Sequence, residues 1–197
     1  MAYKAMNWLR KLLIREKAIS TEGIRAKLIK DRIVFLGLPI NDEAASSIIR
    51  DIGFLVEQNQ TKPISLYVNS PGGAINSSMR IIRAMDRHRP LMTTINLKLS
   101  AGTAAIIVGH GARGSRFALS ASVFRLEPAS ILFGLDIYNG AGGNPITVDH
   151  NDMAAILARD CRRELLEVAE RMRQRLVLDA YDGQAYGLID RVIDRAL

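Results

Sequence analysis

Two glycine-containing junctions hold the residues best suited to chemistry. The run NSPGG at 69–73 follows an apolar segment and precedes an amphipathic one, so two adjacent glycines lie between an expected strand and an expected helix. Glycines there let backbone amides approach a ligand and donate to it, as an oxyanion hole requires. Gly72 and Gly73 are therefore candidate oxyanion-binding residues. A second junction, LSAGTAA at 99–105, predicts a helix start where a nucleophile would be stabilised by the helix dipole.

Two other motifs carry weaker signals. The run GHGARG at 109–114 matches the spacing of a dinucleotide-binding loop, but SRFALS follows it and is typical of a strand. A dinucleotide site needs the loop to open a helix, so the run is interpreted as a turn. The single cysteine, Cys161, lies within an expected helix without a nearby activating histidine, which favours a buried structural thiol.

Histidines and acidic residues form no convincing metal site. The three histidines, His88, His110 and His150, are too far apart in sequence for an argument from spacing. Residues 149–152, DHND, could bind a metal, but Asp and Asn there also suit the cap of the helix that follows, and we favour the cap. We expect no metal and no cofactor.

The elements that must position these residues alternate between strands and helices. Strands are expected at 32–38, 64–68, 92–99 and 116–126, and the last of these is either a pair of strands or one strand with a bend. Amphipathic helices are expected after the Asn41 cap, at 74–87 and at 148–176. A short helix and a strand are expected at 185–193. This order predicts parallel βαβ units and an α/β fold.

Composition and charge narrow the class of protein. With 197 residues, 48% of them hydrophobic, and one cysteine, the chain suits one globular domain and excludes a disordered, collagen-like or disulfide-rich protein. No apolar run is long enough to span a membrane. The net charge is +7. Residues 1–32 hold nine basic and three acidic side chains and so contribute +6 of it.

The basic excess therefore belongs to the N-terminal segment 1–32, which begins with a basic arm at 1–21, and nucleic acid is not an expected partner of the body. Within the arm, Trp8, Leu9, Leu12 and Leu13 have helical spacing. A solvated arm, a partner-binding helix, a contact with an anionic membrane face or nucleic acid, and a targeting peptide all remain open.

Five segments together resemble the ClpP serine peptidase family (peptidase S14). They are DRIVFLGLPINDEAASSIIRDIGFL, ISLYVNSPGGAINSSMRIIRAM, the residues RP and TTI within 89–95, GARGSRFAL and AYGLIDRVI, in the family's order and spacing. The resemblance implies the ClpP/crotonase-like α/β fold of repeated βαβ units with a protruding handle helix. It implies one domain at 22–197, with the head at 22–129 and 177–197 and the handle at about 130–176.

Carrying the family's catalytic triad onto this chain gives a negative result. The nucleophilic serine of the family corresponds to Gly102, and its histidine corresponds to Glu127. No counterpart is assigned to the aspartate, because its segment is missing and Asp179 and Asp182 lie too close to YGLID. Glycine has no nucleophile, so the resemblance implies a catalytically inactive, ClpR-like member and no catalytic residue.

Two further departures concern assembly. The family docks a Clp AAA+ ATPase in apolar pockets lined by aromatic residues, and the corresponding positions here are Ser65, Tyr67 and Arg87. Two polar residues there would weaken docking of an apolar anchor. Residues 130–147 are longer than the equivalent part of the family, in the region where its two seven-membered rings meet, and could alter ring pairing.

The sequence thus predicts a non-catalytic subunit of a Clp protease core in a mixed ring with active ClpP subunits. One alternative is an active serine-type or crotonase-like hydrolase with a displaced site, using Ser100 or Glu127. Another is a homo-oligomeric structural ring. The expected location is a bacterial cytoplasm or, alternatively, a plastid stroma.

Overall fold

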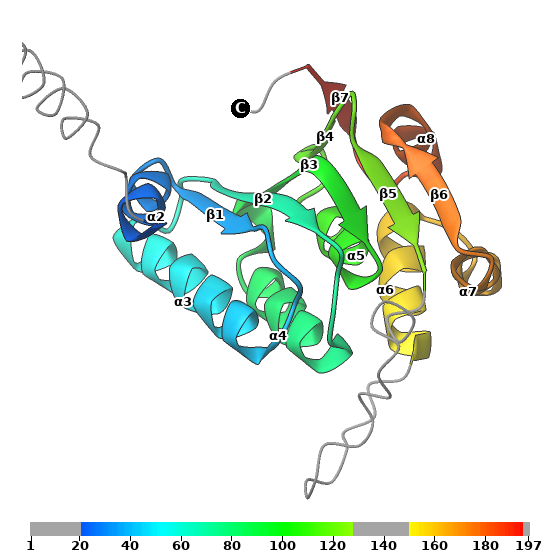
Figure 1. Cartoon of the computed structure of the whole chain (residues 1–197), viewed down its shortest axis with the longest axis horizontal. Coiled ribbons are helices and arrows are strands. Elements are labelled where there is room, and N and C mark those ends of the chain that lie inside the picture. The colour runs from blue at the N-terminus through cyan, green and yellow to red at the C-terminus, as the bar shows by residue number, and fades with distance from the viewer. Residues whose placement is uncertain (1–20, 128–149, 195–197) are drawn as a thin grey trace, which may run out of the picture.

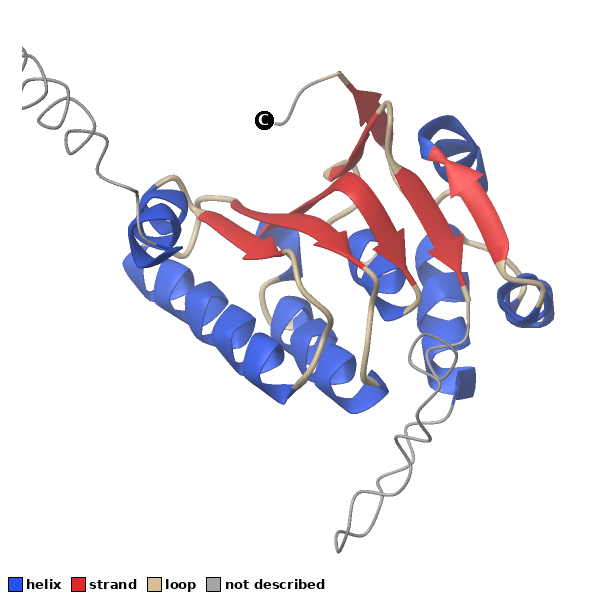
Figure 2. Ribbon diagram, viewed as in Figure 1, coloured by secondary structure: helices blue, strands red, loops and turns tan. Residues whose placement is uncertain are grey.

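The computed structural model describes residues 21–127 and 150–194, which form one sheet with helices packed against it (Figures 1 and 2). In chain order the elements are α2 (Thr21–Lys30), β1 (Ile33–Leu36), α3 (Asp42–Gln58), β2 (Ile64–Ser70), α4 (Ile75–Asp86), the 3-10 helix η1 (Arg89–Leu91), β3 (Met92–Ala101), α5 (Thr103–Gly109), β4 (Arg116–Leu119), β5 (Val123–Leu126), α6 (His150–Cys161), α7 (Leu165–Arg173), β6 (Leu176–Asp179), α8 (Ala180–Tyr186) and β7 (Arg191–Ile193). The predicted alternation, and with it the α/β class, is confirmed.

The sheet is mainly parallel and divides at its longest strand. Strands β1, β2, β3, β4 and β7 lie side by side in that order, and all of these pairs are parallel. Strand β3 pairs with β4 through residues 94–96 and with β5 through residues 99–101. Strand β5 also pairs, antiparallel, with β6. Within residues 116–126, β4 and β5 thus follow one another along the same edge of β3 and do not pair with each other. Of the two predicted alternatives, one strand with a bend is closer to this arrangement than two paired strands.

Four helices, α3, α4, α5 and α6, lie next to one another on one face of the sheet (Figure 2). Each turns its apolar residues inward; in α3 these include Ile48, Ile52 and Leu55. Its predicted N-cap is confirmed, because the Asn41 side chain accepts the amide of Ala44 at 2.8 Å. Along strand β2, every second residue is buried against these helices, while Ser65 and Asn69 on the other face are only half-buried.

A second, smaller apolar cluster occupies the opposite face of the sheet. Tyr67, Ile95 and Phe117 are at most 9% exposed there, and Ile33, Leu97 and Ile193 pack against them. Tyr67 lies on this face because it alternates with Leu66 and Val68, which belong to the main core. We call these six residues the upper cluster.

Arg116 of the GARGSRFAL segment ties the C-terminal half together. Its side chain is buried and pairs with Asp190 through two nitrogens, at 3.0 and 2.7 Å. Its remaining terminal nitrogen donates to the backbone oxygens of Gly109, Asp160 and Gly187 at 3.0–3.2 Å. One guanidinium thereby joins β4, α5, α6 and the turns around α8, which uses the planar fork that only arginine offers.

The prediction of one helix over 148–176 is wrong. The chain breaks between α6 and α7 at Arg162, whose φ of 56° is left-handed, and the Arg163 amide bonds back to Ala158 O at 2.9 Å. This hydrogen bond, from the amide of one residue to the carbonyl oxygen five residues earlier, is typical of helix ends, where the left-handed residue is usually glycine and not arginine. Arg163 holds the break in place, because it donates to Tyr186 O at 2.8 Å and its guanidinium lies 4.0 Å from the Tyr186 ring centroid.

Several predictions lie outside the described residues: the arm up to residue 20, the segment 130–147 and the proposed cap at Asp149. Within the described part of the chain, no helix combines the length and apolar character needed to cross a membrane. The GHGARG run ends α5 and leads into β4, so it is a turn, as expected.

Candidate functional site

The two predicted glycine junctions lie side by side at the carboxyl ends of β2 and β3. These strands are parallel neighbours, and Ser70 pairs with Ser100 at the end of the shared register. The chain then turns through Gly72 and Gly73 into α4, and through Gly102 into α5. Ligand sites in parallel sheets form at this edge, because the strand-to-helix loops gather there.

The glycine pair admits no side chain. Gly72 has φ +83°, and a Cβ on it would lie 2.4 Å from Ala101 O. A Cβ on Gly73 would lie 2.2 Å from Ile40 O, because Ile40 and Gly73 form an isolated parallel bridge. The backbone of 72–73 is therefore fitted tightly between the chain before α3 and the start of α5.

The amides of both glycines are already bonded within the chain. The Gly72 amide donates to Ser70 Oγ at 3.1 Å, and the Gly73 amide donates to Thr103 Oγ1 at 3.1 Å. Both side chains are buried, and Ser70 Oγ in turn donates to Leu38 O at 2.7 Å. The two candidate oxyanion donors thus have hydroxyl acceptors of their own. Sequence reasoning missed Ser70 and Thr103, although each is a hydroxyl residue beside one of the glycine junctions.

Gly102 occupies a sharp strand-to-helix turn. It is the N-cap of α5, with φ 52° and ψ −123°, and its amide donates to Arg125 O at 2.9 Å. Hydrolases of other folds hold a nucleophile on a strained turn between a strand and a helix. Here the position carries a hydrogen atom in place of a side chain, so the turn presents no nucleophile.

The two side chains that could replace the missing groups are buried. Ser100 lies within β3 and is 0% exposed, and its hydroxyl has no hydrogen-bond partner among the described residues. Glu127 follows β5 and is 2% exposed. Its Oε2 accepts from Arg125 at 3.2 Å, while Oε1 is buried without a partner in the described chain. A nucleophile or base must reach its substrate, and neither of these groups is exposed to one.

The residues just before β6 supply no acidic side chain in register with Glu127. Leu176 pairs with Leu126 at the end of the antiparallel β5–β6 ladder, so the residue before β6, Arg175, continues the register towards Glu127. Asp179 instead caps α8 by accepting the Asp182 amide at 2.8 Å. Sequence reasoning did not single out Arg175, because nothing marks it before the strand register is known.

A buried ionic cluster, which the sequence did not predict, lies away from these junctions. His110 is 0% exposed; its Nδ1 lies 2.7 Å from Asp160 Oδ2 and its Nε2 lies 3.0 Å from Asp86 Oδ1. Burial alone would raise the pKa of Asp160, but hydrogen bonds from His110, Arg159 and Arg89 outweigh it and hold that pKa well below its usual range. The Asp160 carboxylate is thus shared by three side chains from different elements: Arg89 of η1, His110 at the end of α5 and Arg159 of α6.

Cys161 is buried as predicted, and burial raises the pKa of its thiol to about 12. Such a thiol stays protonated at neutral pH and is a poor nucleophile. In the described residues, no group of three or more His, Cys, Asp or Glu side chains could hold a metal ion.

Of the three residues at the predicted docking positions, only Tyr67 belongs to the upper cluster. Ser65 and Tyr67 lie two residues apart on β2, and so on one face, with Tyr67 inside the cluster. Arg87 is exposed at the end of α4. Arg191 of β7 adds a charge that was not predicted, since its guanidinium lies 5.3 Å from the Phe117 ring centroid.

In a comparison with known protein families, the family described as Clp protease matches residues 16–196.

Proposed function

The chain belongs to the Clp protease family, and we propose that within it the chain is a non-catalytic, ClpR-like subunit of a protease core. The observation that carries this proposal is the turn between β3 and α5, where Gly102 offers no nucleophile. Family membership supports a protease-core subunit with oligomeric partners. The loss of catalysis is our inference from the site.

The occupied amides support the same proposal independently. An oxyanion hole must present free donors to the developing charge. The amides of Gly72 and Gly73 donate to Ser70 and Thr103 instead. Restoring a nucleophile would therefore not restore the site, because the amides would first have to leave those hydroxyls.

The alternative of a displaced hydrolase gains nothing from the geometry. Ser100 and Glu127 are both nearly fully buried, and Glu127 is bonded to Arg125. A general base must lie within hydrogen-bond reach of the proton that it removes, and the Glu127 side chain, at 2% exposure, is not open to a substrate.

We propose that the subunit occupies ring positions beside active ClpP-type subunits, in a bacterial cytoplasm or a plastid stroma. An inactive subunit has a role in proteolysis only if catalytic subunits share its chamber. We further propose that it docks a Clp ATPase weakly. Ser65 and Arg87 are polar, and Arg191 lies over Phe117 of the upper cluster, so an apolar anchor would have to displace or desolvate charge.

The test is native mass spectrometry of the full chain, alone and mixed with an active ClpP paralogue from the same source. Each sample is also assayed with a fluorogenic peptide. We expect the chain alone to be inactive and to enter rings whose activity follows the number of active subunits. The paralogue alone, at matched subunit concentration, is the control. Peptide cleavage by the pure chain would refute the proposal, and so would rings that exclude the paralogue.

A further inference from the structure

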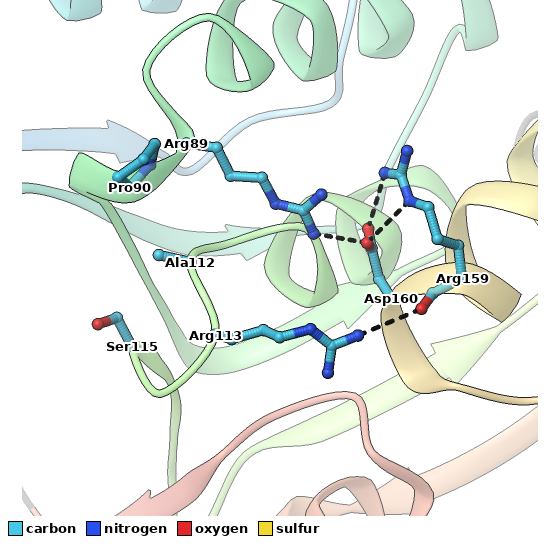
Figure 3. A pocket seen from close by; sticks show the side chains of 7 residues that line it. All are labelled: Arg89, Pro90, Ala112, Arg113, Ser115, Arg159 and Asp160. Carbon is cyan, nitrogen blue, oxygen red and sulfur yellow. Dashed lines mark hydrogen bonds and ion pairs between the residues drawn. The ribbon is translucent and has the colours of Figure 1, made fainter.

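A cationic cleft lies on the surface above the buried ionic cluster. Its volume is about 590 Å³, and it is bounded by η1, by the loop between α5 and β4 and by the end of α6 (Figure 3). The lining residues are Arg89, Pro90, Ala112, Arg113, Ser115, Arg159 and Asp160. Three of these seven are arginines, one from each of the three elements, and only one is acidic.

The acidic residue is fully engaged and orients two of the arginines. Asp160 is 3% exposed, and Arg89 donates to its Oδ1. Arg159 donates through Nε to the same oxygen at 3.1 Å and through Nη2 to Oδ2 at 3.4 Å, and Oδ2 also faces His110 at 2.7 Å. A guanidinium has five donors, so Arg89 and Arg159 each keep free N–H groups after this contact.

The third arginine has almost no internal partner. Arg113 is exposed, and among the described residues its guanidinium makes one hydrogen bond, to Arg159 O at the long distance of 3.4 Å. Figure 3 shows its side chain extending beneath Asp160, with Arg89 approaching from the other side. Counting Asp160 as −1 and the three arginines as +3, the lining carries +2.

We propose that this cleft binds a phosphate group. Guanidinium groups bind phosphate through paired, charge-assisted hydrogen bonds. Three of them arriving from separate elements suit a tetrahedral anion with several acceptor oxygens better than a planar carboxylate, which one arginine fork can satisfy. The Ser115 hydroxyl in the lining offers a further donor. The phosphate comes either from free inorganic phosphate or from a soluble phosphate ester.

The proposal is tested on the full chain by isothermal titration calorimetry with inorganic phosphate and, in a second arm, with AMP, both at constant ionic strength adjusted with chloride. Arg113→Gln removes the arginine that has the fewest internal contacts and leaves the Asp160 contacts in place. Arg83→Gln is the charge-matched control, because Arg83 is exposed on α4 and has no partner within the described chain. We expect Arg113→Gln to weaken phosphate binding about tenfold, allowing for the exposure of the site.

Tighter binding of AMP than of inorganic phosphate would support an ester as the source, and the reverse would support free phosphate. The proposal is overturned if the wild-type chain shows no phosphate binding beyond the chloride background. It is also overturned if Arg113→Gln and Arg83→Gln lower the affinity equally, since the effect would then be one of net charge.

Discussion

The hydroxyl of Thr103 holds the Gly73 amide, and replacing Thr103 tests that contact directly. Thr103 is 1% exposed, so Thr103→Val keeps the shape of the side chain and removes only the acceptor. The Gly73 amide would then be buried without a partner. Leaving one buried donor unsatisfied costs about 1–3 kcal/mol.

For a chain of this size, each kcal/mol lowers Tm by about 2–4 °C, so a cost of about 2 kcal/mol predicts a fall of about 6 °C. Thr103→Ser is the control, because it keeps the hydroxyl and loses one buried methyl group, at about 1 kcal/mol. Thermal unfolding should be compared at one fixed subunit concentration, since assembly also raises Tm.

Hydrogen exchange separates the two variants more sharply than Tm does. In Thr103→Val, the peptide containing Gly73 should exchange faster than in the wild type, while in Thr103→Ser it should not. Unchanged exchange at Gly73 in Thr103→Val would mean that the amide does not depend on this hydroxyl. The occupied-amide reasoning would then fail, whatever the Tm.

Three other outcomes follow from the site. Gly102→Ser should leave the chain without peptidase activity, because Glu127 is buried and the oxyanion amides are occupied; cleavage of a fluorogenic peptide by this variant would contradict that. Cys161 should resist alkylation at pH 8 in the folded chain and react once urea unfolds it, since burial raises the pKa of its thiol to about 12; mass spectrometry after iodoacetamide treatment checks this. Asp160→Asn should destabilise the chain by about 3 kcal/mol at pH 7, as expected for breaking a buried ion pair. Because the folded pKa of Asp160 lies below its unfolded value, this loss should be constant above about pH 5 and should shrink as pH falls below about 4, which urea unfolding at several pH values would measure.

The sequence was sufficient for the elements whose signals are local. Glycine pairs, the Asn41 cap and apolar periodicity predicted the junctions and the βαβ order, because each depends on neighbours within a few residues. The break after α6 could not be predicted in this way. Arginine is a good helix former, and what bends the chain at Arg162 is the contact between Arg163 and Tyr186, 23 residues later.

The site was predictable to the same extent. Gly102 and Glu127 came from aligning short motifs, but their burial and bonding did not. The acceptors Ser70 and Thr103 bond to particular amides only because β2 and β3 are neighbours. The Asp160 cluster joins residues 50 and 71 positions apart, from segments that carry no shared motif. Such contacts are set by the packing of α5 and α6 on the sheet.

The pairing of Arg116 with Asp190 has a consequence for biosynthesis. Asp190 and β7 follow every other described helix and strand, and the two partners lie 74 positions apart in the sequence. Until the ribosome has made this segment, a buried guanidinium lacks its carboxylate and β4 has an open edge, and domains generally fold as whole units. The nascent chain can therefore complete this sheet only after Asp190 and β7 have been made. Until then, its exposed strand edge is the surface that a chaperone would have to protect.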